Sequence, residues 1–167
     1  MQVLLQSLES TQHPMYARAL NHIKTDYCIH GIFKELIDFS LENIVIGCDV
    51  IEHLLGNERV MVTDFPPLFV RRLVDCMNQP EHRINRRIAR IIHLIDLDIA
   101  YCLERFHRGL LSIDENECIS SFIGLDELNA DDLIIRVLSK ESAIHELSYY
   151  VIELSIRKPH VDYSEIL

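Results

Sequence analysis

The sequence has no tryptophan and only five glycines among its 167 residues, and aromatic residues make up 7% of it. Neither G-x-x-x-x-G-K-[ST] nor G-x-G-x-x-G occurs, so we do not expect a glycine-rich loop that binds nucleotide phosphates. The nucleophile pattern G-x-S-x-G is also missing. Few aromatic side chains are available to stack on nucleic-acid bases, which disfavours nucleic acid as a partner.

Long hydrophobic runs and paired cysteines are lacking as well. No apolar run approaches the ~20 residues that cross a bilayer, and the N-terminal MQVLLQSLES has no basic segment of the kind that begins a signal peptide. We therefore expect a cytoplasmic location and no membrane partner. The five cysteines stand at positions 28, 48, 76, 102 and 118, without C-x-x-C spacing. This pattern favours inert thiols in a core over disulfides or a zinc module.

The stretch from Pro80 to Gly109 has the strongest helical pattern. Apolar residues recur there at steps of three and four and share one face, namely Ile84, Ile88, Ile91, Ile95, Ile99, Cys102 and Phe106. Between Ile91 and Leu103 the apolar residues extend almost around the helix, as in helices that other helices surround. The pattern predicts one continuous helix over residues 80–108, roughly 45 Å long, at the centre of the fold.

Helical spacing and helix-terminus signals cover most of the remaining chain. Further helices are expected over residues 14–29, 32–55, 66–77, 112–123, from about 129 onward, and 142–158. Ser112-x-x-Glu115 has the form of a capping box, and Gly124 would end the helix that begins there. We expect an all-α fold: a compact single domain over residues 1–167, with about seven helices and a short C-terminal tail at 159–167.

Metal binding is one alternative function. The pair Glu104-x-x-His107 has the i, i+3 spacing of carboxylate-bridged di-metal bundles. Further candidate ligands would be His93 on the same helix, and His145 and Glu146 on the last one. A second Glu-x-x-His is missing, so we expect no metal and no cofactor. A helical di-metal enzyme or sensor stays open as the alternative.

Two charged features of the long helix need an explanation. Asp98 lies near its apolar face, where a carboxylate must be paired, hydrogen-bonded or neutral; a structural ion pair is favoured over a catalytic role. Four arginines form a basic band, Arg83, Arg86, Arg87 and Arg90. This band could neutralise acids on flanking helices or dock an acidic patch, and nucleic-acid binding through it is a second alternative.

Acidic residues dominate the charge, with 26 Asp and Glu against 16 Lys and Arg and a formal net charge of −10. Seven acids cluster within nineteen residues: Asp114, Glu115, Glu117, Asp126, Glu127, Asp131 and Asp132. Such a surface suits a basic protein partner. We therefore expect a non-catalytic protein-interaction protein, in its sharpest form an inhibitor, immunity protein or adaptor that covers a basic surface. The sequence does not specify an oligomeric state.

Overall fold

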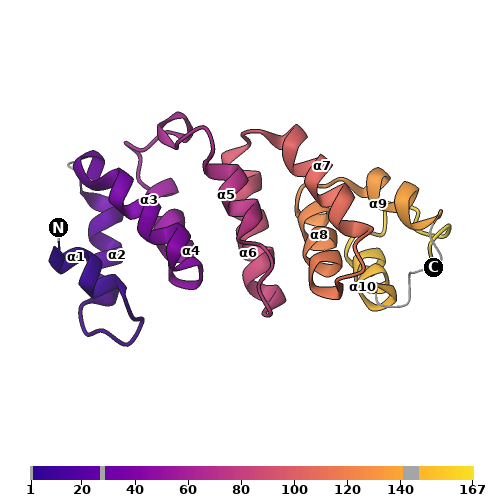
Figure 1. Ribbon diagram of the computed structural model, residues 1–167, viewed down its shortest axis with the longest axis horizontal. Coiled ribbons are helices and arrows are strands. Elements are labelled where there is room, and N and C mark those ends of the chain that lie inside the picture. Colours follow the sequence, from indigo (N-terminus) through magenta and orange to yellow (C-terminus); the bar gives the residue numbers. More distant parts are fainter. Residues whose placement is uncertain (1, 27–28, 141–146) are drawn as a thin grey trace. The chain divides into compact units, whose positions relative to one another are not determined.

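The computed structural model describes residues 2–26, 29–140 and 147–167, and these residues contain helices and no strand (Figure 1). The expected all-α class is therefore confirmed. Contacts between residues divide the chain into two compact units, residues 1–76 and 77–167, which we describe separately. The expectation of a single helical domain stays a prediction. Within the described ranges, no helix combines the length and the apolar character that crossing a membrane requires.

The first unit is built on α4, which packs against α2 and α3, while α1 packs on α2. Its elements are α1 (Gln2–Leu8), α2 (Tyr16–Thr25), η1 (Ile29–Ile32), α3 (Phe33–Glu42), α4 (Ile44–Leu55), η2 (Val62–Asp64) and α5 (Phe69–Asp75). A row of rings, Phe33, Phe65 and Phe69, joins α3 to α5 and the segment before it, with centroids 5.3 and 4.9 Å apart. Each of the three side chains is buried, so aromatic packing is a main contributor to this core.

The expected helix over 32–55 is interrupted at Asn43, which separates α3 from α4. Asn43 has a non-helical backbone (φ −124°, ψ 59°), and its side-chain amide donates to the Phe39 carbonyl at 3.1 Å. Gly47 allows the two helices to approach after this turn, because a Cβ there would lie only 2.1 Å from the Ser40 carbonyl oxygen. The prediction of one continuous helix was wrong, because the chain bends at this residue.

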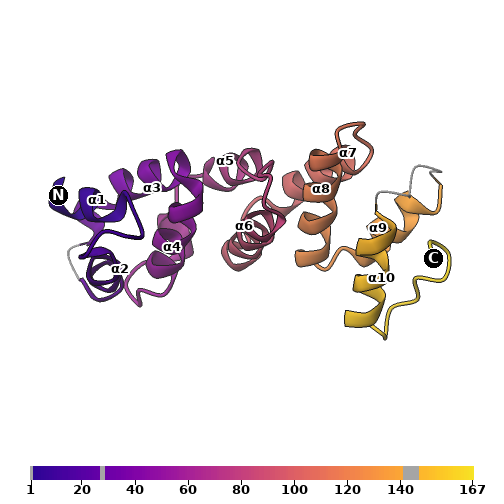
Figure 2. The same ribbon diagram turned by 90° about the horizontal axis from the view of Figure 1, so that it is seen from below.

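The second unit is built on α8, which packs against α6, α7 and α9 (Figure 2). Its helices are α6 (His82–Ile95), α7 (Ile99–Leu110), α8 (Glu115–Glu127), α9 (Asp131–Leu138) and α10 (Ser148–Arg157). The expected helix start at Ser142 lies outside the described residues. After α10 the chain forms turns, and Tyr163 and Ile166 of the short C-terminal tail are buried.

The long central helix predicted over residues 80–108 is wrong, because the chain breaks between α6 and α7 (Figure 1). Asp96 and Asp98 both adopt left-handed backbone conformations, with φ of 51° and 54°. Aspartate tolerates this region better than most residues because its short side chain can form local hydrogen bonds. A left-handed residue ends an α-helix, so the two helices meet at a turn instead of forming one rod.

The apolar stripe survives this break as a core. Ile84, Ile88, Ile91 and Ile95 on α6, and Cys102 and Phe106 on α7, are all buried. Ile99, beside the turn, is half-buried, and Leu94 is 62% exposed. Neighbours therefore cover one face of α6, and the prediction that the helix is surrounded was wrong.

Two predicted helix ends also shift around α8. The N-cap is Asp114, whose carboxylate accepts the Glu117 N–H at 2.9 Å, and not Ser112. Gly124 lies inside α8 instead of ending it. A Cβ at this position would lie 2.6 Å from the Phe106 ring, so Gly124 is required by the close packing of α7 on α8.

Candidate functional site

Asp126 lies at the centre of a buried ionic network in the second unit. It is 2% exposed. One carboxylate oxygen accepts from Arg157 at 2.5 Å and from Arg86 at 3.3 Å, and the other lies 3.3 Å from the Lys158 ammonium. Three cations from α6 and the end of α10 thus surround one carboxylate, which offsets the cost of removing its charge from water.

Two neighbouring acids of the predicted cluster are neutralised in the same way. Glu127 accepts from Arg86 and Arg90, both at 3.2 Å. Asp131 accepts from Lys158 at 3.0 Å and from the Tyr163 hydroxyl at 2.7 Å. Burial, together with this bond to Asp131, raises the pKa of Tyr163 above its usual value.

The basic band is therefore divided between two environments. Arg86 and Arg90 pair with acids of α8, as the expectation of neutralised flanking acids requires. Arg87 is half-buried. Arg83 is 87% exposed, with Glu81 at 3.8 Å. The arrangement leaves no four-arginine surface for a phosphate backbone within the described part of α6.

Glu117 is a fourth acid of the cluster with partners inside the chain. It accepts from the Ser112 hydroxyl at 2.6 Å and lies 2.7 Å from the Arg105 guanidinium. The hydrogen bond from Ser112 has the largest effect on the pKa of Glu117, and the one from Arg105 the next largest; both lower it. Only Asp114, Glu115 and Asp132 of the seven acids are exposed, so the cluster is not one continuous acidic surface.

The stretch from the end of α7 to the first residue of α8, residues 111–115, presents apolar and acidic groups together. Ile113 is fully exposed and Leu111 is 50% exposed. Asp114 and Glu115, which follow, are exposed carboxylates. The backbone of this segment, hereafter the α7–α8 loop, is held in place: the Asp114 N–H donates to the Ser112 hydroxyl at 3.2 Å, and the Ser112 N–H donates to the Gly109 carbonyl at 3.0 Å.

The proposed metal ligands do not come together in the part of the chain that the structure describes. His93 is exposed, Glu104 is exposed and pairs with Arg108 at 3.1 Å, and His107 is half-buried. His145 and Glu146 lie outside the described residues. Over residues 2–26, 29–140 and 147–167, no group of three or more His, Cys, Asp or Glu side chains could hold a metal ion.

Asp98 occupies a turn and not the middle of a helix. It precedes α7, is half-buried, and accepts the Cys102 N–H on its backbone carbonyl at 3.2 Å. The expectation that Asp98 lies near the apolar face assumed one continuous helix over residues 80–108. The break therefore removes the reason for expecting a buried mid-helix carboxylate.

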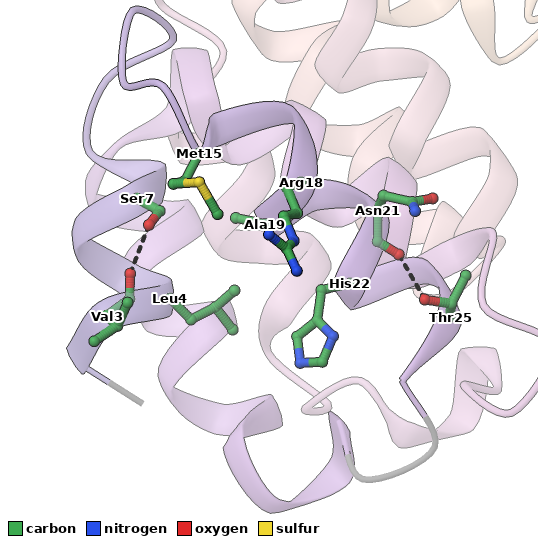
Figure 3. Close-up of a pocket in the computed structure, with 9 residues that line it drawn as sticks. All are labelled: Val3, Leu4, Ser7, Met15, Arg18, Ala19, Asn21, His22 and Thr25. Atoms are coloured by element: carbon green, nitrogen blue, oxygen red, sulfur yellow. Dashed lines mark hydrogen bonds between the residues drawn. The ribbon is translucent and has the colours of Figure 1, made fainter.

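A groove of about 500 Å³ lies between α1 and α2 of the first unit (Figure 3). Leu4, Met15 and Ala19 contribute apolar surface, and Arg18 and His22 contribute the two titratable groups. A smaller hollow of about 270 Å³ in the second unit is lined by His107, Leu111, Arg136, Val137 and Lys140.

Comparison with known proteins identifies no relative: no protein-family model, no curated protein and no solved structure matches this chain. The function of this chain must therefore be inferred from its own sites.

Sequence reasoning missed two of these features, the exposed Ile113 and the groove that Arg18 lines. Ile113 stands alone between polar residues, and its only signal is an apolar residue next to a helix cap. Arg18 has no sequence signal, because only the packing of α1 on α2 creates the groove that it lines.

Proposed function

We propose that this chain is a non-catalytic protein-interaction protein whose α7–α8 loop binds a basic protein partner. The observation that carries the proposal is Ile113, which is fully exposed and directly followed by two exposed carboxylates, Asp114 and Glu115. Its sharpest form is an inhibitor, immunity protein or adaptor that covers a basic functional surface. The expected cytoplasmic location belongs to the same proposal and rests on the sequence alone.

The chemistry of the loop describes the partner. An exposed apolar side chain contributes most binding free energy when it leaves water and enters a pocket of the partner. Carboxylates beside it favour lysine and arginine around that pocket and accelerate association at low salt. The partner surface would thus be an apolar pocket with a basic rim.

The internal pairing of the other acids supports this narrower surface. Glu117, Asp126, Glu127 and Asp131 already have cations of the same chain as partners. Breaking these pairs for a partner would leave charged groups of the fold without their partners. Glu115 can engage a partner without that cost, and Asp114 can do so through the carboxylate oxygen that does not cap α8.

A photo-crosslinking amino acid at position 113 tests the proposal in the full-length protein, expressed in its native cells. We expect it to capture a protein with a basic surface, which can then be purified for binding measurements. A crosslinker at position 94 is the matched control, because Leu94 is also apolar and is 62% exposed on α6. It should not capture the same protein.

Affinity measurements with the captured partner then separate the two contributions. Ile113→Ala should weaken binding about tenfold, and Glu115→Lys, which leaves the Asp114 cap of α8 in place, should reduce both the affinity and its dependence on salt. Asp132→Lys reverses an exposed acid outside the loop and should change affinity far less. Equal effects of reversal at 132 and at 115 would overturn the assignment of the loop.

A further inference from the structure

Arg18 is the unusual residue of the groove between α1 and α2. Among the residues that the structure describes, it has neither an ion-pair nor a hydrogen-bond partner, in a protein of net charge −10. Figure 3 shows Leu4 of α1 on one side of the groove and Arg18 and His22 of α2 on the other. An unpaired guanidinium beside apolar surface is an incomplete site for an anion.

We propose that this groove binds a small monocarboxylate with an apolar chain, the carboxylate pairing with Arg18. The proposal is independent of the protein-binding function of the α7–α8 loop. The volume of about 500 Å³ falls within the ~300–1,000 Å³ of typical small-molecule sites, which are mainly apolar with few polar groups.

The polar groups of the groove select a single negative charge. His22 is already engaged, since its Nε2 lies 2.8 Å from a carboxylate oxygen of Asp26. The Ser7 and Thr25 hydroxyls donate to the Val3 and Asn21 carbonyls, at 2.7 and 2.9 Å. Among the described residues that line the groove, Arg18 is thus the cation without a partner. A dianion such as a phosphate would bring a second negative charge close to the Asp26 carboxylate that pairs with His22, which disfavours it.

The apolar groups of the groove select the rest of the ligand. Leu4 is half-buried and Met15 is 41% exposed. With Ala19 they form a surface from both helices that an aliphatic chain could cover. Methionine is unbranched and flexible, so it adapts to chains of different shape. Burial of this surface adds binding free energy that a bare carboxylate such as acetate cannot gain.

NMR of the full-length protein with ¹³C-labelled methyl groups tests the proposal, with octanoate as the probe. Octanoate should shift the methyl signals of Leu4, Met15 and Ala19 in a saturable manner, with a Kd on the order of 1 mM or below. Octanol and acetate, which lack the charge and the chain respectively, should each bind at least about tenfold more weakly.

Substitution of Arg18 provides the decisive comparison. Arg18→Gln should weaken octanoate binding about tenfold and leave octanol binding unchanged. Arg83→Gln is the matched control, because it removes one exposed arginine and gives the same net charge; it should bind octanoate as the wild type does. The proposal is overturned if octanoate leaves these methyl signals unshifted, if Arg18→Gln binds it normally, or if inorganic phosphate binds more tightly than octanoate.

Discussion

Asp126 holds a negative charge at a position that water barely reaches. Its partners come from distant parts of the chain: Arg86 precedes it by forty residues, and Arg157 and Lys158 follow it by about thirty. The carboxylate therefore ties α6, α8 and the end of α10 together. A buried group with three charged partners makes a large contribution to stability, because removing it strands its partners as well.

Asp126→Asn should lower the free energy of unfolding by about 2–3 kcal/mol. This loss of unfolding free energy lies at the low end for a buried ion pair, because Arg157 is 37% exposed and its guanidinium can be hydrated once the carboxylate is removed. Denaturant unfolding followed by circular dichroism measures it. Asp132→Asn, at an exposed acid of the same stretch, should change stability by less than about 0.5 kcal/mol. Equal stabilities of the two variants would contradict the role given to Asp126.

The pKa of Glu117 leads to a pH-dependent prediction. Hydrogen bonds from Ser112 and Arg105 lower this pKa below its usual value of 4.5. The ionised group thus stabilises the folded state above the unfolded-state pKa, and this stability is lost as the pH falls through the lower folded-state pKa.

Urea unfolding of the wild type and of Glu117→Gln should reveal this linkage. The wild type should be more stable by a constant amount above about pH 5.5, and the difference should shrink below about pH 4.5. Glu115→Gln is the control, because Glu115 has no hydrogen-bond or ion-pair partner within the described residues, and it should unfold as the wild type does. A difference that grows on acidification would show the opposite linkage.

At the level of helices, the turn between α6 and α7 allows both helices to pack against α8. The sequence Asp96-Leu97-Asp98 contains neither glycine nor proline, so its apolar neighbours suggested an uninterrupted helix. The local preference for continuing the helix is worth only a few tenths of a kcal/mol per residue. Packing of both helices on α8 outweighs it.

Substitutions at Asp96 distinguish the turn from a continuous helix. In a left-handed conformation glycine is the best and alanine the worst of the three residues compared, so stability should follow Gly, then Asp, then Ala, with steps of about 0.5–1 kcal/mol. A continuous helix would give the reverse order, because alanine has the highest helix propensity and glycine a low one. Thermal or urea unfolding of Asp96→Gly and Asp96→Ala decides between them.

For the whole molecule, we expect residues 1–76 and 77–167 to unfold as separate units. Each unit contains a cysteine with no exposed surface, Cys48 on α4 and Cys102 on α7. A buried thiol reacts with a labelling reagent only when the structure around it opens. These two side chains therefore report separately on residues 1–76 and 77–167.

Thiol labelling of Asp126→Asn, read by peptide mass spectrometry, tests whether the units are independent. The variant destabilises the second unit, so Cys102 should react at least tenfold faster than in the wild type, while the rate at Cys48 should stay unchanged. Wild-type protein under the same conditions is the reference. Equal acceleration at both cysteines would instead support the single cooperative domain expected from the sequence.

The helical class and much of the core follow from the sequence alone. Ile84, Ile88, Ile91 and Ile95 were recognisable as buried because helical periodicity is local, and a residue and its neighbour one turn away share a face wherever the helix lies. The same reasoning identified Cys102 and Phe106. Each of these residues is buried by contacts with other helices. Its burial can nevertheless be predicted without knowing which helix makes the contact.

The positions of the turns between helices, and the charges that remain at the surface, depend on how the helices pack. The sequence showed seven acids as one group, yet four of them pair with cations that lie on other helices or far along the chain. The same packing leaves Ile113 and Arg18 without partners among the described residues. An ion pair between residues far apart in the sequence depends on how the helices pack. The local spacing of charged residues does not predict such a pair.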